Sequence, residues 1–315
     1  MTAHVVEPSA VALHRTVLVA NQKGGVGKSS IVAALAGLIA RPATRVLVID
    51  ADQQGNVSRN NLGVAGDRGK TLAVALQYGE PLEPVREVRP GLDVIPGGPL
   101  LAGVAGMLAS SQQTGVDVAG NFHATLGELC RKQAYSLVLL DSGPGDAPLL
   151  DVLLGAAHYL LVPSTDDEAS LDGVELLAAR YLRARAGGAA VELLGAVLFN
   201  VNPRATTRNA LAISALSQLL AGSGTSPFAT AVRTDRAAAL DARRRHLTPG
   251  ELVDEATRSR SRRVRQLAAG ARPVADGELW SRDPAGLASD YQALAHELLS
   301  RIAAAERRER SLADL

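Results

Sequence analysis

Residues 16–40 read TVLVANQKGGVGKSSIVAALAGLIA and place a glycine-rich turn between two apolar segments of different character. The β-branched run at 16–20 is typical of a strand buried on both faces, and the Ala/Leu-rich stretch at 29–40 is typical of a buried helix. A strand that passes through a tight glycine loop directly into a helix is the first half of a βαβ unit. This stretch alone favours a fold of the α/β class.

The same alternation continues along the chain. Short apolar runs alternate with longer helical patterns. The runs, which we expect to form strands, lie at 45–50, 92–97, 136–141, 158–164, 193–200 and 228–233. The helical patterns lie at 121–133, 169–186, 206–221 and 284–311. This order predicts an α/β fold with a doubly wound, mostly parallel sheet and helices on both faces. Segment 243–283 is rich in arginine and less regular in pattern, and 284–311 is expected to form a helical C-terminal appendage.

Polar residues stand where the predicted strands end. In a doubly wound sheet, ligands bind at the carboxyl ends of the strands. The residues that fall at this edge are Asn21, Asp50, Asp141, Ser164 and Asn200. We therefore expect the functional site to lie there.

Charge, cysteine content and hydropathy exclude several classes of protein. The 315 residues carry a formal net charge of +1, so attraction to a polyanion must come from a local surface. The single cysteine, Cys130, excludes an internal disulfide and agrees with a reducing cytosol. Residues 1–15 lack the pattern of a secretory signal, and the apolar run at 31–40 is far shorter than the ~20 residues of a membrane-spanning helix. These features predict a cytoplasmic protein.

The glycine-rich loop fits a phosphate-binding loop at all but one position. The general pattern is G-x-x-x-x-G-K-[ST], and Gln22 occupies the place of its first glycine. In such loops backbone N–H groups surround phosphate oxygens, the lysine reaches the β- and γ-phosphates, and the hydroxyl is a ligand of Mg²⁺. The pattern predicts that the nucleotide-binding residues are Lys23, Gly24, Gly25, Val26, Gly27, Lys28, Ser29 and Ser30.

Lys23 is a residue that the general pattern does not require. Only four of the 33 basic Lys and Arg residues are lysines, and two of those four lie in this loop. The motif K-G-G-x-G-K-[ST] resembles the deviant phosphate loop of the ParA/MinD family of P-loop NTPases. In that family the signature lysine reaches the nucleotide of a second subunit, so that two monomers enclose two ATP molecules. The resemblance implies an ATP-dependent homodimer in which Lys23, with Lys28, belongs to the catalytic site.

Two further segments carry the resemblance. VLVIDADQQGN (46–56) is similar to the family's switch I segment, VLLVDxDPQGN, which implies that Asp52 orients the attacking water and that Asp50 lies near the metal. Gln53 departs from the family, which usually has proline there, and glutamine should loosen the backbone locally. YSLVLLDSGPG (135–145) is similar to the strand that ends in the Walker B aspartate. The implied Mg²⁺ residues are therefore Ser29, Asp50 and Asp141.

The resemblance covers residues 16–255. VLFNVNPR (197–204) is similar to the family's stretch that ends beside the adenine, which makes Asn200 the adenine candidate; the alternative is an asparagine that only ends a strand. We divide the chain into an N-terminal extension (1–15), a P-loop ATPase domain (16–256), and a basic, helical C-terminal region (257–315) packed on the same domain.

Members of the family differ in what they bind. A nitrogenase-type reductase needs two cluster-binding cysteines per chain, so the single Cys130 excludes it. A MinD-like membrane switch needs bulky apolar residues on a terminal helix, but the last twelve residues offer only Leu312 and Leu315. The apolar stripe at 287–302 has the spacing of a core-packing face. A DNA-partition ATPase is therefore favoured over the MinD-like alternative, and a cargo-positioning ParA-like ATPase remains open.

Local charge also favours a DNA-binding member. Residues 233–265 contain ten arginines against five acidic residues, which suits sequence-independent contact with phosphates. The alternative is a solvated arginine-rich surface without a ligand. Segment 227–256 also resembles a closing segment seen more in partition and cargo-positioning members than in MinD. The candidates for DNA contact are Arg204, Arg208, Arg233, Arg236, Arg258, Arg260, Arg262, Arg263 and Arg265.

The resemblance implies a cycle that uses ATP and Mg²⁺. The ATP-bound homodimer would bind non-specific DNA, and hydrolysis would release it. A centromere-binding, ParB-like partner protein would accelerate a slow intrinsic hydrolysis. Such a protein would be cytoplasmic and nucleoid-associated, without contact to a membrane.

Overall fold

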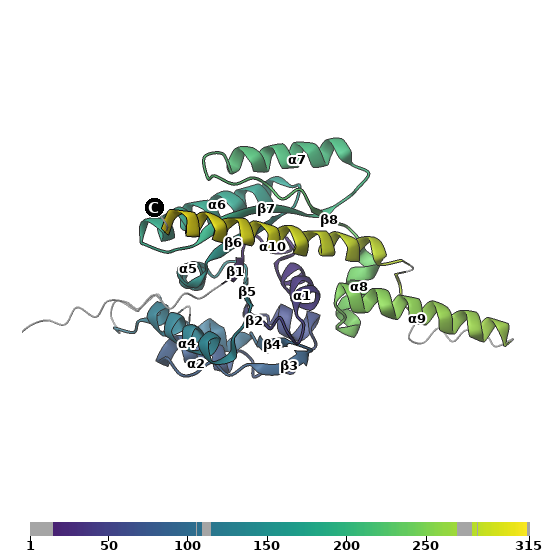
Figure 1. The fold of residues 1–315 in the computed structure, drawn as a ribbon, viewed down its shortest axis with the longest axis horizontal. Helices are drawn as coiled ribbons and strands as arrows, with labels where there is room; N and C mark the ends of the chain where they lie inside the picture. Colours follow the sequence, from purple (N-terminus) through teal and green to yellow (C-terminus); the bar gives the residue numbers. More distant parts are fainter. Residues whose placement is uncertain (1–14, 105, 109–114, 270–278, 282, 314–315) are drawn as a thin grey trace, which may run out of the picture.

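A single eight-stranded sheet lies at the centre of the fold (Figure 1). The computed structural model describes residues 15–313 apart from 105, 109–114, 270–278 and 282. Within these residues the strand order is β3-β4-β2-β5-β1-β6-β7-β8, and only the pair of β3 with β4 is antiparallel. The predicted fold class, a doubly wound and mostly parallel sheet, is confirmed.

The inner strands are apolar on both sides because helices cover both faces of the sheet. The strands are β1 (Thr16–Val19), β2 (Val46–Ala51), β3 (Val85–Arg89), β4 (Leu92–Ile95), β5 (Leu137–Ser142), β6 (Tyr159–Ser164), β7 (Glu192–Val201) and β8 (Ala231–Arg233). Every residue of β1, β2, β5 and β6 is buried. The edge strand β3, VREVR, is largely exposed, and the apolar-run criterion did not predict it.

Helices cover both faces of this sheet. They are α1 (Lys28–Ile39), α2 (Lys70–Tyr78), α4 (Val118–Gln133), α5 (Ala147–Ala156), α6 (Glu168–Ala186), α7 (Thr206–Leu219), α8 (Arg236–Arg245), α9 (Pro249–Ala268) and α10 (Ala285–Ala313), with short helical turns at Asn56–Asn61 and Pro99–Leu101. One apolar core joins α2, α4, α5, α6 and α7 to one face, and a second joins α1 and α10 to the other. None of the described helices has the length and apolarity needed to cross a bilayer.

The C-terminal helix α10 is part of the second core. The predicted apolar stripe is buried at Tyr291, Leu294, Leu298 and Ile302, which are at most 6% exposed. Its role as a core-packing face is therefore confirmed. Residues 1–14 of the expected N-terminal extension lie outside the described residues.

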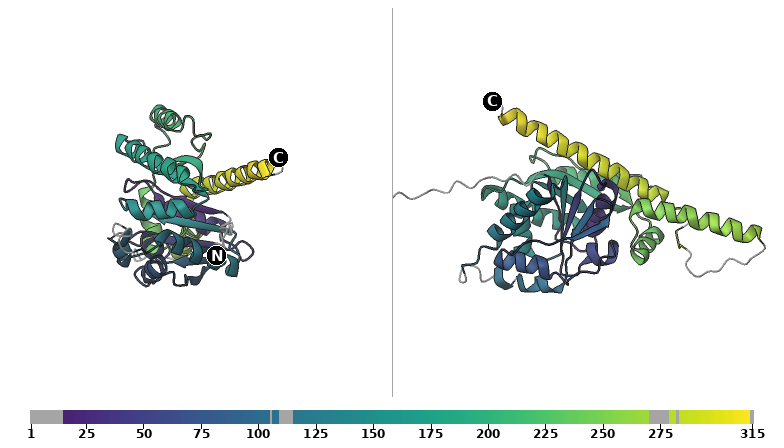
Figure 2. Two further views of the ribbon diagram at one scale, coloured as in Figure 1. Left: turned by 90° about the vertical axis from the view of Figure 1, so that its left-hand side faces the viewer. Right: turned by 60° about the horizontal axis from the view of Figure 1, so that its bottom comes forward.

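The arginine-rich segment is more regular than the sequence pattern suggested. Segment 243–283 has a less regular sequence pattern than the rest of the chain, yet α9 is a continuous helix from Pro249 to Ala268. Thr248 and Glu251 form a capping box at its start, and the rest of the helix contains neither glycine nor proline after Gly250. Its second half projects beyond the rest of the molecule (Figures 1 and 2). The domain boundary that we placed at residue 256 falls inside this helix.

Candidate functional site

The loop between β1 and α1 has the backbone that a phosphate-binding loop needs. Gly25 and Gly27 adopt left-handed conformations with φ of 79° and 90°. At Gly27, a Cβ atom would lie 2.6 Å from the ring of Phe199, so both the backbone angle and the close approach require glycine. No described side chain caps α1, which begins at Lys28. The N–H groups of its first turn are therefore available to an anion.

Lys28 lies beneath this loop and is only 5% exposed. Its Nζ atom donates a hydrogen bond of 2.8 Å to the Lys23 carbonyl oxygen. Burial lowers the pKa of Lys28, although the charges of Asp141 and Asp52 oppose that shift. An anion bound in the loop would favour the charged ammonium and so oppose the effect of burial.

Ser29 and Asp141 form the group best suited to a divalent cation. Ser29 Oγ donates a hydrogen bond of 2.7 Å to Asp141 Oδ2. Asp141 Oδ1 is buried and has no hydrogen-bond partner among the described residues. Burial, and then the neighbouring Asp50, raise the pKa of Asp141. An unsatisfied carboxylate oxygen beside a hydroxyl fits Mg²⁺, which uses one or two carboxylates together with water and phosphate.

A Mg²⁺ site at Ser29 and Asp141 does not require that protein side chains supply all the ligands. Among the described residues there is no cluster of three or more His, Cys, Asp or Glu side chains that could hold a metal ion. A site made of Ser29, Asp141 and nucleotide oxygens is consistent with that finding, because Mg²⁺ at nucleotides seldom has an all-protein cage.

Asp50 is adjacent to Asp141 in the sheet register, but its oxygens bind the chain that follows β2. Asp50 Oδ1 accepts a hydrogen bond of 3.2 Å from Asp52 N. Its Oδ2 accepts from Ser58 N at 2.8 Å and from Ser58 Oγ at 2.7 Å. Burial raises the pKa of Asp50 to about 6. The structure thus gives Asp50 a role in positioning the Asp52 segment, and its metal role stays a prediction.

Asp52 lines a cavity in front of the glycine loop, and its carboxylate is held by hydrogen bonds. It is 4% exposed, and its Oδ1 and Oδ2 accept hydrogen bonds from Gln54 N (3.0 Å) and Asn56 Nδ2 (2.9 Å). A Cβ at Gly143 would approach Asp52 Oδ1 to 3.0 Å, so the segment after β5 packs closely on it. We expected Gln53 to loosen this backbone, but its side chain instead donates a hydrogen bond to Asp146.

A cavity of 620 Å³ opens in front of the glycine loop. This volume is in the range of small-molecule sites, about 300–1,000 Å³. The cavity is lined on the loop side by α1, Asp52, Phe199 and Asn200. It is also lined by α8, by the start of α9 with Leu247 before it, and by the start of α10, which contributes Leu287 and Tyr291. The sequence reasoning did not predict Phe199 or the walls from α8 and α10. The sequence did contain one sign of Phe199 as a site residue: it is one of only three phenylalanines and directly precedes the adenine candidate Asn200.

Asn200 lines this cavity at the end of β7, with a left-handed φ of 61°. Its carbonyl oxygen and Oδ1 both accept hydrogen bonds from Thr234 Oγ1, at 2.8 and 2.9 Å. This arrangement fixes the orientation of its side chain. Its contact with adenine stays a prediction.

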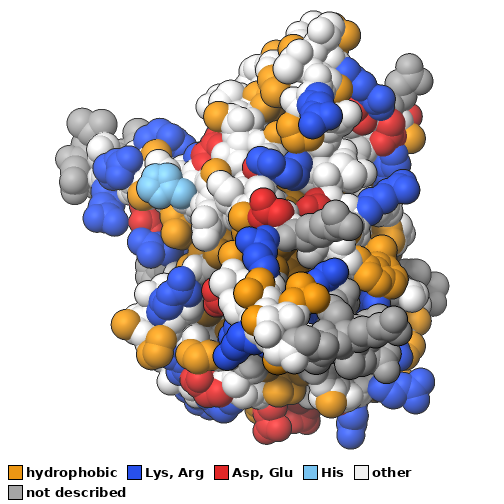
Figure 3. Space-filling view, turned by 90° about the vertical axis from the view of Figure 1, so that its right-hand side faces the viewer, with side chains coloured by type: hydrophobic (Ala, Val, Ile, Leu, Met, Phe, Trp, Pro, Cys, Tyr) orange, Lys and Arg blue, Asp and Glu red, His pale blue; other side chains and the backbone are white. Residues whose placement is uncertain are grey.

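The nine candidate arginines lie in three separate groups. Arg233 and Arg236 line the cavity, and Arg233 binds Asp290 of α10 through Nε (2.6 Å) and Nη2 (2.8 Å). Arg204 is exposed before α7, and Arg208 in the first turn of α7 pairs with Asp166 at 2.5 Å. The remaining group is exposed along α9 and consists of Arg258, Arg260, Arg262, Arg263 and Arg265. Two of these, Arg258 and Arg262, pair with Glu255. Figure 3 shows Lys and Arg side chains spread over the end of the molecule that carries α8 and α9.

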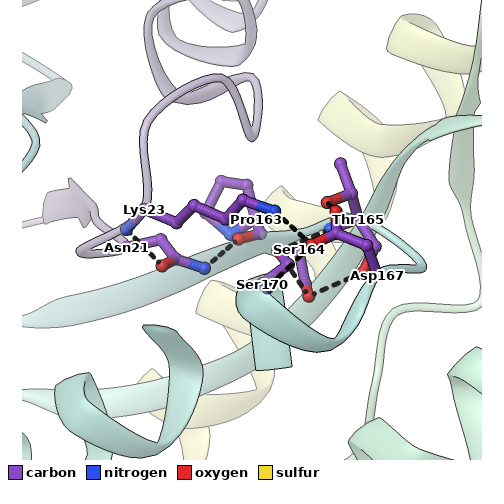
Figure 4. A network of polar contacts seen from close by, with 7 residues as sticks. All are labelled: Asn21, Lys23, Pro163, Ser164, Thr165, Asp167 and Ser170. Carbon is purple, nitrogen blue, oxygen red and sulfur yellow. Dashed lines mark hydrogen bonds and ion pairs between the residues drawn. The ribbon is translucent and has the colours of Figure 1, made fainter. Parts of the chain in front are cut away.

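Lys23 takes part in a polar network that joins the loop to β6 and α6 (Figure 4). Its backbone N–H donates to Asn21 Oδ1 at 2.9 Å, and Asn21 Nδ2 donates to Pro163 O at 2.8 Å. The Lys23 ammonium forms an ion pair with Asp167, at the start of α6. The sequence reasoning did not identify Asp167, because its partner lies 144 positions away in the chain.

Comparison with known proteins assigns the chain to a family. The AAA_31 family model, described as an AAA domain, matches residues 14–185, which is more than half of the chain. The chain is 39% identical over 173 residues to the chromosome-partitioning ATPase Soj of Thermus thermophilus. It is 32% identical over 188 residues to the chromosome partitioning protein ParA of Caulobacter vibrioides. The chain therefore belongs to this family of ParA-type P-loop ATPases.

The extent of these matches is limited. The Thermus alignment covers 55% of this chain and 64% of the relative, and the Caulobacter alignment covers 58% and 68%. The chain thus spans just under two thirds of the Thermus protein. Among solved structures, a Cyanothece McdA–ATP complex matches 84% of this chain and 99% of its own, with a TM-score of 0.65 and 20% identity. That likeness concerns the fold.

Proposed function

We propose that this chain is a DNA-partition ATPase that binds ATP in the cavity, dimerises, binds non-specific DNA and releases it on hydrolysis. The observation that carries the proposal is the Ser29–Asp141 pair, with its unsatisfied carboxylate oxygen, beneath a left-handed glycine loop and an uncapped helix. The matches to a chromosome-partitioning ATPase and a chromosome partitioning protein support it.

The loop binds and orients the triphosphate. Its backbone N–H groups and the first turn of α1 surround the phosphates, and Lys28 contributes the buried positive charge. Ser29 and Asp141 would hold Mg²⁺, with Asp50 next to Asp141 in the sheet register. When bound, Mg²⁺ neutralises the charge that develops on the phosphates. The nucleoside would occupy the remaining part of the cavity, which is lined by Phe199 and Asn200.

Hydrolysis depends on a positioned water. Asp52 is at the cavity wall, and its carboxylate is held by Gln54 N and Asn56 Nδ2, so that it presents a fixed acceptor to the attacking water. Intrinsic turnover is expected to be slow because an aspartate acceptor alone supplies only part of the stabilisation that a bound partner adds. A ParB-like partner protein bound to a DNA site is the proposed source of the rest.

Dimer formation couples the binding of ATP to the binding of DNA. Lys23 reaches the nucleotide of a second subunit, so ATP is required for the homodimer. The dimer presents two copies of the exposed α9 arginines and of Arg204, which doubles the phosphate contacts and raises DNA affinity steeply. The protein would then be cytoplasmic and nucleoid-associated.

Binding to a long random-sequence DNA duplex tests the proposal. Binding is measured without nucleotide, with ADP, with ATP and with a non-hydrolysable ATP analogue, each at two salt concentrations. We expect binding only with ATP or the analogue, weaker at the higher salt because counterion release drives phosphate contact. Equal binding in all nucleotide states, or none in any, contradicts it; liposome binding is then measured to test the MinD-like alternative.

A further inference from the structure

In this structure the loop lysine binds within its own subunit. Lys23 Nζ pairs with the carboxylate of Asp167 (Figure 4). The proposed dimer requires the same ammonium at the nucleotide of a second subunit. Because one ammonium on one side chain cannot occupy both positions, the ion pair with Asp167 competes with the contact between subunits.

Asp167 is held so that its charge points at the loop. Its Oδ1 accepts a hydrogen bond of 3.1 Å from Ser170 N and so caps α6, and its Oδ2 accepts from Thr165 Oγ1 at 2.5 Å. The hydrogen bond from Lys23 is the main cause that lowers the pKa of Asp167. The hydrogen bonds from Ser170 and Thr165 do not involve Lys23, so they hold the Asp167 carboxylate in place when Lys23 leaves.

The packing of α6 against the loop also fixes the backbone and Cβ of Lys23. A Cβ added to Gly173 of α6 would lie 2.4 Å from Asn21 Oδ1 and 3.3 Å from the Lys23 Cβ. Only a glycine allows α6 to lie this close to residues 21–23. The N-terminal half of α6 and the start of the loop thus form one packed unit, in which Lys23 can swing only at the outer end of its side chain.

We propose that Asp167 is a positioning residue that keeps Lys23 in a resting position in the monomer, and that this ion pair must open before the ATP-bound dimer forms. The inference rests on the proposed function, in which Lys23 contacts the second subunit. The Lys23 and Asp167 side chains are 29% and 44% exposed, so the pair lies at the surface and can open without disturbing the core. An exposed pair is weak, and triphosphate oxygens replace it readily.

Asp167→Asn tests this directly, and Asp166→Asn is its matched control. Asparagine caps a helix as well as aspartate does, so the variant removes the charge and keeps the cap. Asp166 is the neighbouring residue and pairs with Arg208 instead of Lys23, so its variant makes the same change of charge one position away. The readout is the dimer dissociation constant with a non-hydrolysable ATP analogue, measured by sedimentation, alongside nucleotide affinity at concentrations where the protein is monomeric.

We expect Asp167→Asn to lower the dimer dissociation constant. An exposed ion pair changes an equilibrium constant by up to about fivefold, and two pairs open per dimer, so the decrease is about two- to twenty-fivefold. Asp166→Asn should stay within about twofold of the parent, and nucleotide affinity of the Asp167→Asn monomer should be unchanged. If Asp167→Asn folds poorly, Asp167→Ser, which also caps a helix without charge, replaces it.

Failure of this inference can be told apart from failure of the proposed function. An unchanged or weaker Asp167→Asn dimer, while Lys23→Ala loses the ATP-dependent dimer, overturns the resting position alone. A Lys23→Ala protein that still dimerises with ATP overturns the proposed function, and this inference with it. A tighter dimer in both the Asp166 and the Asp167 variants would show a general effect of charge and also overturn the inference.

Discussion

Gln53 Nε2 donates a hydrogen bond of 3.1 Å to Asp146 Oδ2, and this contact joins the segment after β2 to the segment after β5. Asp146 Oδ1 also accepts from Leu149 N at 3.2 Å and so caps α5. Gln53 stands where the switch I pattern that this segment resembles has proline, whose side chain cannot donate such a bond. The substitution therefore replaces the restriction of a proline ring by a contact between the two segments that flank the proposed catalytic water.

Removing this contact is expected to affect turnover more than binding. Gln53→Ala frees the Asp52 segment from the β5 side, and we expect kcat to fall about three- to tenfold, because small displacements of a positioning group are costly. KM for ATP should stay within about twofold, since the glycine loop is untouched. The control is Gln54→Ala, because Gln54 is the exposed neighbour of Gln53. Equal kinetics of the two variants would contradict a role for the bond to Asp146.

Asp52 is expected to act on hydrolysis and not on binding. In Asp52→Ala the acceptor for the attacking water is lost, so we expect turnover to fall at least about 100-fold. Binding of a non-hydrolysable ATP analogue should persist, and the ATP dimer should remain on DNA. Turnover and the rate of DNA release are measured in parallel. Rapid release of DNA by this variant would contradict the assigned role.

The close approach of Phe199 makes Gly27 the most restricted glycine of the loop. Gly27→Ala meets both a left-handed backbone and a ring at 2.6 Å, whereas Gly25→Ala meets the left-handed backbone with nothing within 4 Å. We expect Gly25→Ala to lower the free energy of unfolding by about 1–2 kcal/mol. Gly27→Ala should lower the free energy of unfolding by about 1–3 kcal/mol more than Gly25→Ala does, because the added methyl group overpacks against Phe199. Urea unfolding measures both, and similar losses would contradict the role of Phe199.

The sequence predicted much of the fold because buried strands and amphipathic helices leave strong local patterns. The runs that became β1, β2, β5 and β6 are apolar throughout, and all their residues are buried. The edge strand β3 was missed because it pairs on one side only and carries Arg86 and Glu87 toward solvent. Helix α9 was harder to recognise because its residues are mostly charged and exposed, and Leu252 is its one buried residue among those described.

The site was predictable to the extent that it is local. The glycine loop, Asp52 and Asp141 stand at strand ends in recognisable motifs, and the structure brings them to one edge of the sheet. Contacts between distant segments left no such pattern. Lys23 with Asp167, Phe199 over Gly27 and Arg233 with Asp290 each depend on how separate elements pack.

The anchor of α9 is expected to weaken in acid. Arg89 Nε and Nη2 donate to the Glu251 carboxylate at 2.8 and 3.0 Å, and Thr248 N donates to Glu251 Oε2 at 2.7 Å. Burial alone would raise the pKa of Glu251, but hydrogen bonds from Arg89 and Thr248 outweigh burial and hold this pKa below its ordinary value. Because the folded pKa is the lower one, the stabilisation is complete above the unfolded value of 4.5 and is lost as pH falls through the folded value.

Glu251→Gln tests this anchor. At pH 7 we expect the free energy of unfolding to fall by about 1 kcal/mol, a modest value because Glu251 is partly exposed to solvent. The difference from the parent protein should shrink as pH falls below 4.5. The control is Glu309→Gln, at an exposed acidic position on α10. If the decrease in the free energy of unfolding is the same at all pH values, the effect of Glu251→Gln comes from packing and not from the charge of Glu251.

The arginines of α9 should set the salt dependence of DNA binding. The triple variant Arg260→Gln, Arg263→Gln and Arg265→Gln leaves in place the two α9 arginines that pair with Glu255, Arg258 and Arg262. It also retains good helix formers. The control replaces Arg307, Arg308 and Arg310 by glutamine at the opposite end of the molecule, near the C-terminal end of α10 (Figure 1). It removes the same number of charges, although Arg308 and Arg310 pair with Glu192 and Glu306. Affinity for random-sequence duplex DNA with a non-hydrolysable ATP analogue is measured across salt concentrations.

Each phosphate contact that is lost should reduce the slope of log affinity against log salt by about 0.9. Because a dimer carries two copies of α9, we expect the α9 variant to lower this slope by at least about 2, and the α10 variant to leave it nearly unchanged. Nucleotide affinity should be equal in both, since none of the six residues lines the cavity. Equal slopes in the two variants would show that the α9 arginines do not contact DNA. Arg204, before α7, and Arg208, in its first turn, would then be the remaining candidates at that helix.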